Sequence, residues 1–206
     1  MTYTFDTFVV SAATQDAWSA AVAVANDRER AHNPLLLFGR TGSGKSHLLH
    51  AIEHAMRLRR RDANVLHLSA AMFASSILDA FRDDRLEAFQ RRLASLDALL
   101  LDDFRLLADK EATEREVLRQ IETLAARGVQ VVVTSDEPSR LKGAHAVEVG
   151  YPDGAARAEI ARRVAAAQRV TLPEDVVRYV TEQTTGSAPE LRSMILRIAA
   201  EAQLDA

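Results

Sequence analysis

The sequence predicts an α/β fold in which helices cover both faces of a parallel sheet and a small helical domain follows. Three observations predict it. Short, continuous apolar runs alternate with helical patterns between residues 35 and 149, as expected for strands that are buried on both faces. A glycine-rich turn joins the first such strand to a helix. Beyond the turn cluster at residues 151–154, every segment has helical spacing.

Length and composition suit such a domain. The chain has 206 residues, of which 48% are hydrophobic and 27% charged, enough for one α/β domain and a helical appendage. The net charge is −3, so the chain as a whole has no electrostatic footprint for tight, non-specific DNA binding. There is no cysteine, which excludes disulfides and thiolate metal sites.

Nothing in the sequence predicts a membrane association. No apolar run reaches membrane-spanning length, and the N-terminal residues MTYTFDTF lack the pattern of a signal peptide. We therefore expect a cytoplasmic protein with no membrane partner.

The first elements can be assigned from spacing and from breaks in it. Residues 1–10 suit an extended lead-in, and residues 11–30 are alanine-rich with helical spacing. Asn33-Pro34 breaks that pattern, and the apolar run Leu35–Phe38 then predicts a strand. After the glycine-rich turn, a helix is expected over residues 45–60.

The rest of the sheet domain follows the same alternation of apolar runs and helical spacing. Strands are expected at residues 63–69, 98–101, 129–133 and 146–149, and helices at 70–82, 84–95 and 111–127.

The C-terminal part is predicted to be all helical. Residues 151–154 (Tyr-Pro-Asp-Gly) form a turn cluster and a plausible hinge. Pro173 and Pro189 suit the first turns of helices, where the missing N–H costs nothing. We expect helices at 155–169, 174–184 and 189–203. The chain thus divides into an α/β core, residues 1–151, and a helical lid, residues 152–206.

The glycine-rich turn carries the clearest chemistry. It matches G-x-x-x-x-G-K-[ST] at every fixed position, after a strand and before a helix. Its glycines let consecutive N–H groups point inward, and the helix N-terminus adds positive potential. Lys45 supplies a charge for the β- and γ-phosphates, and the Ser46 hydroxyl is placed to bind Mg²⁺. We expect ATP or ADP with Mg²⁺, held by Gly39, Arg40, Thr41, Gly42, Ser43, Gly44, Lys45, Ser46 and His47.

A second apolar run ends in Asp102-Asp103. In P-loop enzymes an acid at this place holds Mg²⁺ or its water, and we assign that role to Asp102. Asp103 is then placed to orient or deprotonate the attacking water, which makes Asp103 and Lys45 the predicted catalytic residues. The alternative is a strand end with two solvated acids. One side chain of residues 134–136 could sense the γ-phosphate.

With these motifs in place, the sequence resembles the ATPase domain of the bacterial replication initiator DnaA and related regulators such as Hda. The resemblance covers nearly the whole chain and implies an AAA+ P-loop NTPase fold, with a five-stranded parallel core and a lid over the nucleotide. It also implies that residues 3–10 lie against the adenine, which adds Val9 to the nucleotide-binding residues. The matching segments are residues 3–10, 33–35, 47–52, 96–103, 108–111 and 134–138.

The sequence departs from the family at two arginines. Residues 139–144 run almost straight into the last strand, without the family's arginine finger for a neighbouring subunit. In the lid, Pro189 stands before Glu190-Leu191, where the family has an arginine that contacts the γ-phosphate. Arg192 is expected on another side of that helix. Since such arginines stabilise charge in the transition state, we expect nucleotide binding with weak intrinsic ATPase activity.

Two further departures concern DNA. The family's single-strand contact uses a basic residue after Lys-Glu, but here Ala112 follows Glu111. The sequence ends at Ala206 without a helix-turn-helix segment. We therefore expect weak or absent direct DNA binding.

The function that these features favour is regulation of replication initiation, as an accessory factor whose partner is the initiator or another AAA+ subunit. Three alternatives stay open: a helicase loader or transposition-type ATPase, a small-molecule kinase, and a nucleotide-bound scaffold without turnover. The six histidines show no metal-ligand spacing. The arginines that end the helix after the P-loop are expected to face solvent, with a DNA-binding patch as the alternative.

Overall fold

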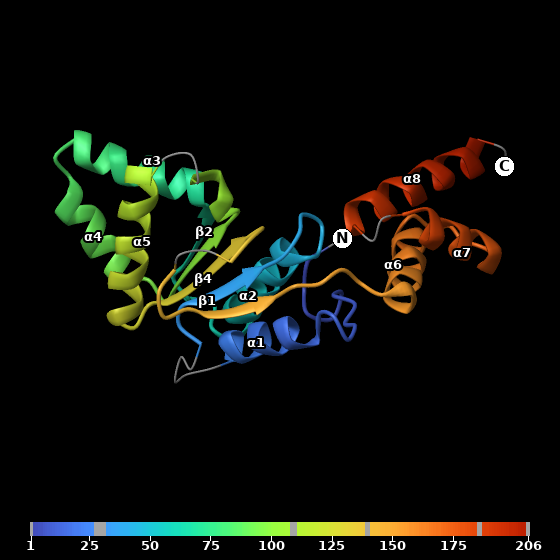
Figure 1. Cartoon of the computed structure of the whole chain (residues 1–206), viewed down its shortest axis with the longest axis horizontal. Helices are drawn as coiled ribbons and strands as arrows, with labels where there is room; N and C mark the ends of the chain where they lie inside the picture. Colours follow the sequence, from blue (N-terminus) through green and yellow to red (C-terminus); the bar gives the residue numbers. More distant parts are fainter. Residues whose placement is uncertain (1, 27–31, 108–110, 139–140, 185–186, 205–206) are drawn as a thin grey trace.

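The computed structural model describes residues 2–26, 32–107, 111–138, 141–184 and 187–204. Its centre is a five-stranded sheet in the order β2-β3-β4-β1-β5, in which every neighbouring pair is parallel (Figure 1). The predicted parallel sheet is therefore confirmed. The strands are β1 Leu35–Phe38, β2 Val65–Ser69, β3 Ala98–Asp102, β4 Gln130–Ser135 and β5 His145–Glu148.

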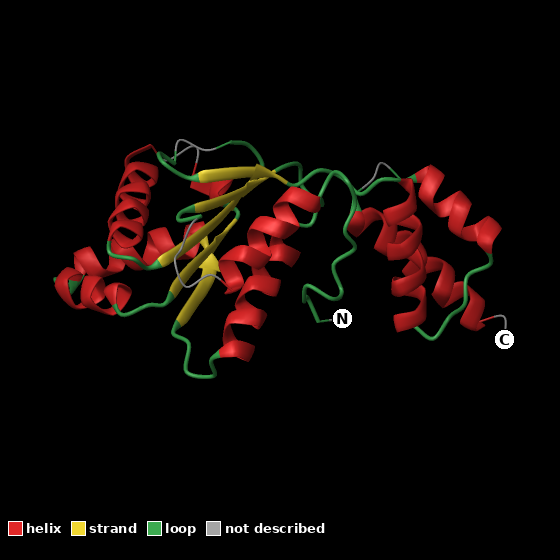
Figure 2. Cartoon of the chain, turned by 90° about the horizontal axis from the view of Figure 1, so that it is seen from below, coloured by secondary structure: helices red, strands yellow, loops and turns green. Residues whose placement is uncertain are grey.

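Helices cover both faces of the sheet (Figure 2). Successive side chains of a strand point to opposite faces, and each face has its own core. Leu35, Leu37 and Leu100 pack with the first two helices, whereas Leu36, Leu99 and Leu101 pack with helices of the other face. This explains the uninterrupted apolar runs. The helices are α1 Gln15–Asn26 and α2 Lys45–Arg59 on one face, and α3 Ala70–Arg82, α4 Leu86–Ala94 and α5 Glu111–Ala126 on the other, with a 3₁₀ turn at Phe104–Leu107.

A bundle of three helices lies beyond the end of the sheet (Figures 1 and 2). It has a separate core, in which Val164, Val180 and Ile195 are buried. Because its apolar side chains pack on one another, the bundle contacts the rest of the chain mainly around the cavity described below. Its helices are α6 Gly154–Ala167, α7 Glu174–Gln183 and α8 Ala188–Leu204.

Some element boundaries differ from expectation. Helix α1 begins at Gln15, since the Ser11 N–H donates to Thr14 Oγ1 in a turn that precedes it. Helix α4 begins at Leu86, after Asp84 with its left-handed φ of 55°. Pro173 is the N-cap residue of α7 rather than part of its first turn. None of the helices within the described ranges is long and apolar enough to cross a membrane.

The sheet brings distant parts of the chain to one edge. Since all strands are parallel, their carboxyl ends meet at the same side of the sheet. The turn of residues 39–44 follows β1, Asp102 ends β3, and Asp136 follows β4. These segments, remote in sequence, therefore lie together.

Candidate nucleotide-binding site

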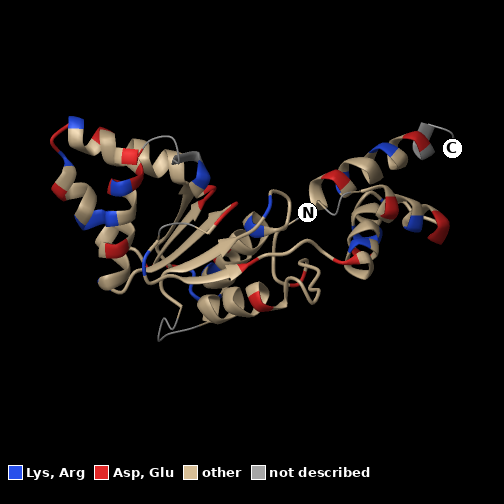
Figure 3. Cartoon of the chain, in the orientation of Figure 1, with Lys and Arg blue, Asp and Glu red and all other residues tan. Residues whose placement is uncertain are grey.

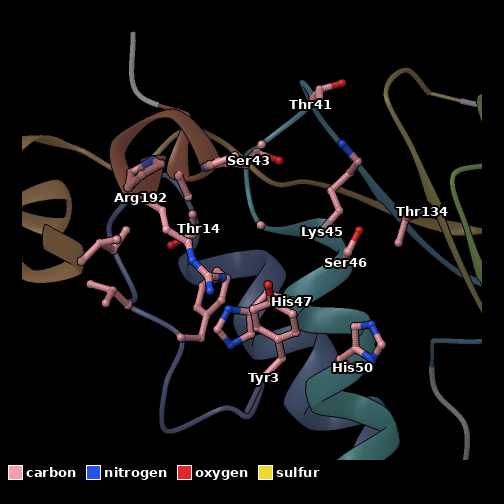
Figure 4. Close-up of a pocket in the computed structure, with 18 of the residues that line it drawn as sticks. Tyr3, Thr14, Thr41, Ser43, Lys45, Ser46, His47, His50, Thr134 and Arg192 are labelled. Carbon is pink, nitrogen blue, oxygen red and sulfur yellow. The ribbon is translucent and has the colours of Figure 1, made fainter. Parts of the chain in front are cut away.

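A cavity of about 570 Å³ lies at this edge of the sheet (Figure 4). Four parts of the chain line it: the N-terminal segment, residues 41–46 of the P-loop (residues 39–46), the ends of β3 and β4, and helices α6 and α8. The helical bundle is attached at the rim. The Ala188 N–H donates to the Gly42 carbonyl at 3.1 Å, and the Tyr151 hydroxyl donates to the Thr41 carbonyl at 3.1 Å.

The P-loop depends on glycine at two close approaches. Gly39 and Gly42 have φ of 148° and 85°, which L side chains rarely adopt. A Cβ on Gly39 would lie 2.3 Å from the Val149 carbonyl oxygen, and one on Gly42 would lie 2.6 Å from Ser187 Oγ. Gly44 caps α2 without any side-chain hydrogen bond. The first N–H groups of α2 are thus not capped by a side chain, as suits an anion site.

Lys45 is buried at the centre of the loop. Its ammonium donates to the Gly39 carbonyl at 2.6 Å, the Arg40 carbonyl at 3.2 Å and Asp136 Oδ1 at 2.9 Å. Gly39 and Arg40 therefore contribute backbone carbonyls to Lys45. The ammonium is held where the loop closes on itself, at the end of β4.

The carboxylate of Asp136 accepts hydrogen bonds from two side chains and lies close to an arginine. Thr41 Oγ1 donates to its Oδ2 at 3.0 Å, and Arg105 Nε lies 3.4 Å from the same oxygen. Burial raises the pKa of Asp136, but the hydrogen bonds from Lys45 and Thr41 outweigh burial and hold this pKa below its ordinary value. Asp136 is therefore ionised at neutral pH, next to the charge expected to bind phosphate.

The predicted magnesium ligands lie side by side. The Ser46 hydroxyl donates to Asp102 Oδ1 at 3.2 Å, and the Thr134 hydroxyl donates to the same oxygen. Thr134 in turn accepts from the Asp103 N–H at 2.9 Å, so the end of β4 fixes both acids. A hydroxyl and a carboxylate are oxygen ligands of the kind Mg²⁺ prefers. These residues fit the metal predicted from the sequence.

Asp103 occupies a different position from Asp102. It has a left-handed backbone, with φ of 58°, and it is exposed at the cavity. Asp103 therefore lines the same cavity as Lys45 and Ser46. This placement is compatible with the role predicted for it.

His47 and Val9 line the other end of the cavity. His47 Nε2 donates to the Thr4 carbonyl at 3.0 Å, and its ring lies edge-on to Phe8 at 5.1 Å. Burial lowers the pKa of His47, so the ring is neutral at physiological pH. His47 thereby holds the N-terminal segment, which includes Val9, against α2.

Two arginines of the helical bundle also line the cavity. Arg192 lies on α8 and contributes to the lining (Figure 4), so the expectation that it points elsewhere was wrong. The reason is simple, because residues three apart share a helix face and Pro189 lines the cavity too. Arg163 on α6 was missed; its guanidinium bonds Glu159 and donates to the Asp6 carbonyl at 3.1 Å. Nothing in the sequence pattern singles it out.

Comparison with known proteins decides the family. The model of the bacterial DnaA ATPase domain matches residues 1–146. The chain belongs to this family. Two curated relatives align with 98% of this chain. They are the chromosomal replication initiator proteins DnaA of Caldanaerobacter subterraneus subsp. tengcongensis, with 32% sequence identity, and of Enterococcus faecalis, with 34%. The match covers 48% of each relative, so the chain spans about half of their length.

Solved structures agree with the DnaA assignment. Domain III of the Thermotoga maritima replication initiation protein DnaA has a TM-score of 0.88 and 27% identity, over 98% of this chain and 90% of that one. The AMPPCP-bound DnaA of Aquifex aeolicus has a TM-score of 0.83 and 26% identity, over 95% of this chain and 64% of that one. The AAA+ fold implied by the resemblance is confirmed.

The Lys45–Asp136 contact leads to a prediction for the nucleotide-free protein. Asp136→Asn should lower the free energy of unfolding by about 1–3 kcal/mol at neutral pH, because Lys45 loses its charged partner. The folded pKa of Asp136 is depressed. Its stabilisation is therefore complete above the unfolded pKa of about 4 and is lost as pH falls through the folded value. Urea unfolding at neutral pH and at about pH 3 should show the difference between the two proteins shrinking in acid.

Glu137→Gln is the matched control, since Glu137 is the next acid along the chain and is exposed. It should change stability little at either pH. An Asp136→Asn effect that is the same in acid as at neutral pH would show that the ion pair is not its source.

Proposed function

We propose that this chain binds ATP or ADP together with Mg²⁺, hydrolyses ATP slowly, and regulates or assists the initiation of DNA replication. One observation carries the first part. The ammonium of Lys45, the hydroxyl of Ser46 and the carboxylate of Asp102 meet at a cavity large enough for a nucleotide. The likeness to the AMPPCP-bound DnaA of Aquifex aeolicus supports the same ligand class.

Each residue then has a defined task. The P-loop amides surround the phosphates, and Lys45 exchanges Asp136 for phosphate oxygens as its partner. Ser46 and Asp102 would hold Mg²⁺, which neutralises charge on the phosphates when bound. Asp103 orients or deprotonates the attacking water. Val9 and His47 would flank the adenine.

Slow hydrolysis is expected from the sequence of residues 139–144, in which Arg140 does not stand in the R-x-x-S-R-F-like pattern that supplies the family's arginine finger. Ser139 and Arg140 lie outside the described residues. A missing arginine finger is worth about 10³-fold or more in rate. The lid, in contrast, does bring Arg163 and Arg192 to the cavity, so the argument for slow turnover now rests on the finger alone.

A regulatory role follows from the same asymmetry. A chain that offers no finger could still receive one, if its own site faces an initiator subunit or another AAA+ subunit that carries the arginine. We further propose that residues 1–151 act as the nucleotide-binding core and residues 152–206 as a lid hinged near Pro152. The lid contacts at Gly42 and Thr41 would make its position depend on the occupied P-loop.

A DNA-associated ATPase is the second candidate. A DnaA structure bound to AMPPCP and single-stranded DNA has a TM-score of 0.81 and 27% identity over 95% of this chain. Against this, acidic and basic side chains are interspersed along α3, α4 and α5 (Figure 3), and Ala112 offers no charge. Lys110 lies outside the described residues. Affinity for a labelled single-stranded oligonucleotide, with and without nucleotide, separates the two functions.

Lys45→Ala tests the nucleotide site. Loss of the ammonium should weaken ATP and ADP binding by about 10–100-fold, since it removes charged hydrogen bonds to the phosphates. A fluorescent-nucleotide titration measures this, with Lys142→Ala, an exposed lysine, as the control. Wild-type turnover should stay well below about 1 s⁻¹. Equal binding by Lys45→Ala would refute the site, and fast turnover by the protein alone would refute the slow ATPase.

Arg192→Ala tests the lid arginine. If Arg192 reaches the γ-phosphate, the variant should lose about 10-fold in affinity for ATP and much less for ADP. Arg197→Ala is the control, because Arg197 is an exposed arginine of the same helix. The ratio of the two affinities is the informative quantity. An unchanged ratio would mean that Arg192 lines the cavity without contacting the terminal phosphate.

The regulatory proposal predicts nucleotide-dependent association with an initiator. Purified chain and a replication initiator DnaA should co-elute on size exclusion with ATP, and less with ADP or with Lys45→Ala. The failure of every nucleotide condition to give a complex would remove the regulatory role and leave the nucleotide site untouched.

A further inference from the structure

Three side chains outside the phosphate site meet on the side of α2 that faces β2. His50, Glu53 and His67 each place one ligand atom within 4.8 Å of the other two. His50 and Glu53 are three residues apart on α2 and so share a helix face. His67 stands in the middle of β2 and is brought to them by the packing of helix on sheet. The sequence shows no metal-ligand spacing among its histidines, since this group forms only when His67 of a separate element packs against α2.

The contacts of the trio are close and partly shielded from water. His67 Nδ1 lies 2.7 Å from Glu53 Oε2, and the rings of His50 and His67 are 4.5 Å apart. The side chains of His67 and Glu53 are only 12% and 22% exposed, whereas His50 is exposed and leaves a path from solvent. Two imidazoles and one carboxylate thus converge on a partly buried point that an ion can reach.

The carboxylate is prepared for this role by a neighbour. Arg57 Nε donates to Glu53 Oε1 at 3.0 Å, which orients the group and leaves Oε2 directed at His67. Glu53 thus has one oxygen held by Arg57 and the other within reach of an ion beside His67. Partners that orient a ligand in this way accompany most protein metal sites.

We propose that His50, Glu53 and His67 bind a divalent transition-metal ion, with Zn²⁺ as the first candidate, at a site separate from the phosphate site. Two imidazole nitrogens and a carboxylate oxygen are a known zinc ligand set, with a water in the fourth position. Mg²⁺ prefers oxygen ligands and near-octahedral geometry. The ligand chemistry therefore separates this site from Ser46 and Asp102.

Ion binding requires one local change. The proton that His67 Nδ1 donates to Glu53 Oε2 is exchanged through solvent for one on Nε2 of the same ring, so the imidazole stays neutral, and the ion takes the place of the proton between the two atoms. With metal–ligand distances of about 2.0–2.2 Å in tetrahedral geometry, these two atoms need to separate by well under about 1 Å. A small rotation of exposed His50 then completes the set.

The site adjoins the nucleotide cavity through His50, which also lines it. The ring of Tyr3 stacks on His50 at 5.7 Å and tilts against His47 at 4.8 Å, and all three side chains are labelled in Figure 4. An ion would immobilise the ring against which the N-terminal segment packs. Ion binding at the trio does not require a nucleotide, so it can be tested in the absence of nucleotide.

The experiment is a Zn²⁺ titration of tag-free, metal-free protein without nucleotide, in competition with a chromophoric chelator. One equivalent should bind with a Kd of about 1 µM or tighter. His50→Ala and His67→Asn should each weaken binding by at least about 10–100-fold. His54→Ala should not, because His54 is an exposed histidine on the same helix outside the trio. Co²⁺ in place of Zn²⁺ should give visible absorption bands that an excess of Mg²⁺ leaves unchanged.

Several outcomes would overturn the proposal. The first is the absence of saturable Zn²⁺ binding tighter than about 0.1 mM. The second is an equal loss of Zn²⁺ affinity in His54→Ala. The third is a loss of Zn²⁺ affinity in Asp102→Asn, which would place the ion at the predicted magnesium ligands. His50→Ala is decisive, because an exposed side chain can be removed without unfolding the chain, as circular dichroism will show. If any of these outcomes is found, the hydrogen bond between Glu53 and His67 serves only to join β2 to α2.

Discussion

The position of the Lys45 ammonium organises the P-loop and the strand ends next to it. Lys45 is bound at once to two carbonyls of its own loop and to Asp136 at the end of β4. The loop can close in this way only because its glycines adopt left-handed backbone conformations. Sheet, loop and helix α2 therefore share a single charged contact, and a partly buried ion pair of this kind is costly to leave half broken.

That contact also implies a competition. In the proposed nucleotide complex, a triphosphate would offer Lys45 a denser negative charge than one carboxylate, so Asp136 would give up part of its contact with the ammonium. Thr41 and Arg105 remain as partners for Asp136, which limits the cost of the exchange. Asp136 thus holds the Lys45 ammonium at the place where the proposed phosphate ligand would meet it.

Much of the core could be predicted because its signals are local. Leu35–Phe38 and the run ending at Asp102 are buried on both faces, and such strands are recognisable as continuous apolar runs. The P-loop is contiguous in sequence and could be identified in full. Boundaries were less certain, since they depend on single residues such as Asp84, whose left-handed backbone the pattern does not reveal.

The contacts made across the chain could not be predicted. Arg163 reaches the cavity only because α6 docks beside the N-terminal segment, and His67 meets α2 only through packing of a helix on an edge strand. Asp136 was noted as a strand-end residue, yet its bond to Lys45 depends on strand order, with β4 beside β1. Local spacing carries no information on such neighbours unless the topology is known.

The hydrogen bond from the Ala188 N–H to the Gly42 carbonyl has a mechanical consequence. It joins the first residue of α8 to the P-loop at Gly42, so a rotation of the loop there turns the whole helix about its first residue. At 17 residues, α8 is about 25 Å long. A rotation of a few degrees at the loop therefore displaces the far end of α8 by about an ångström or more.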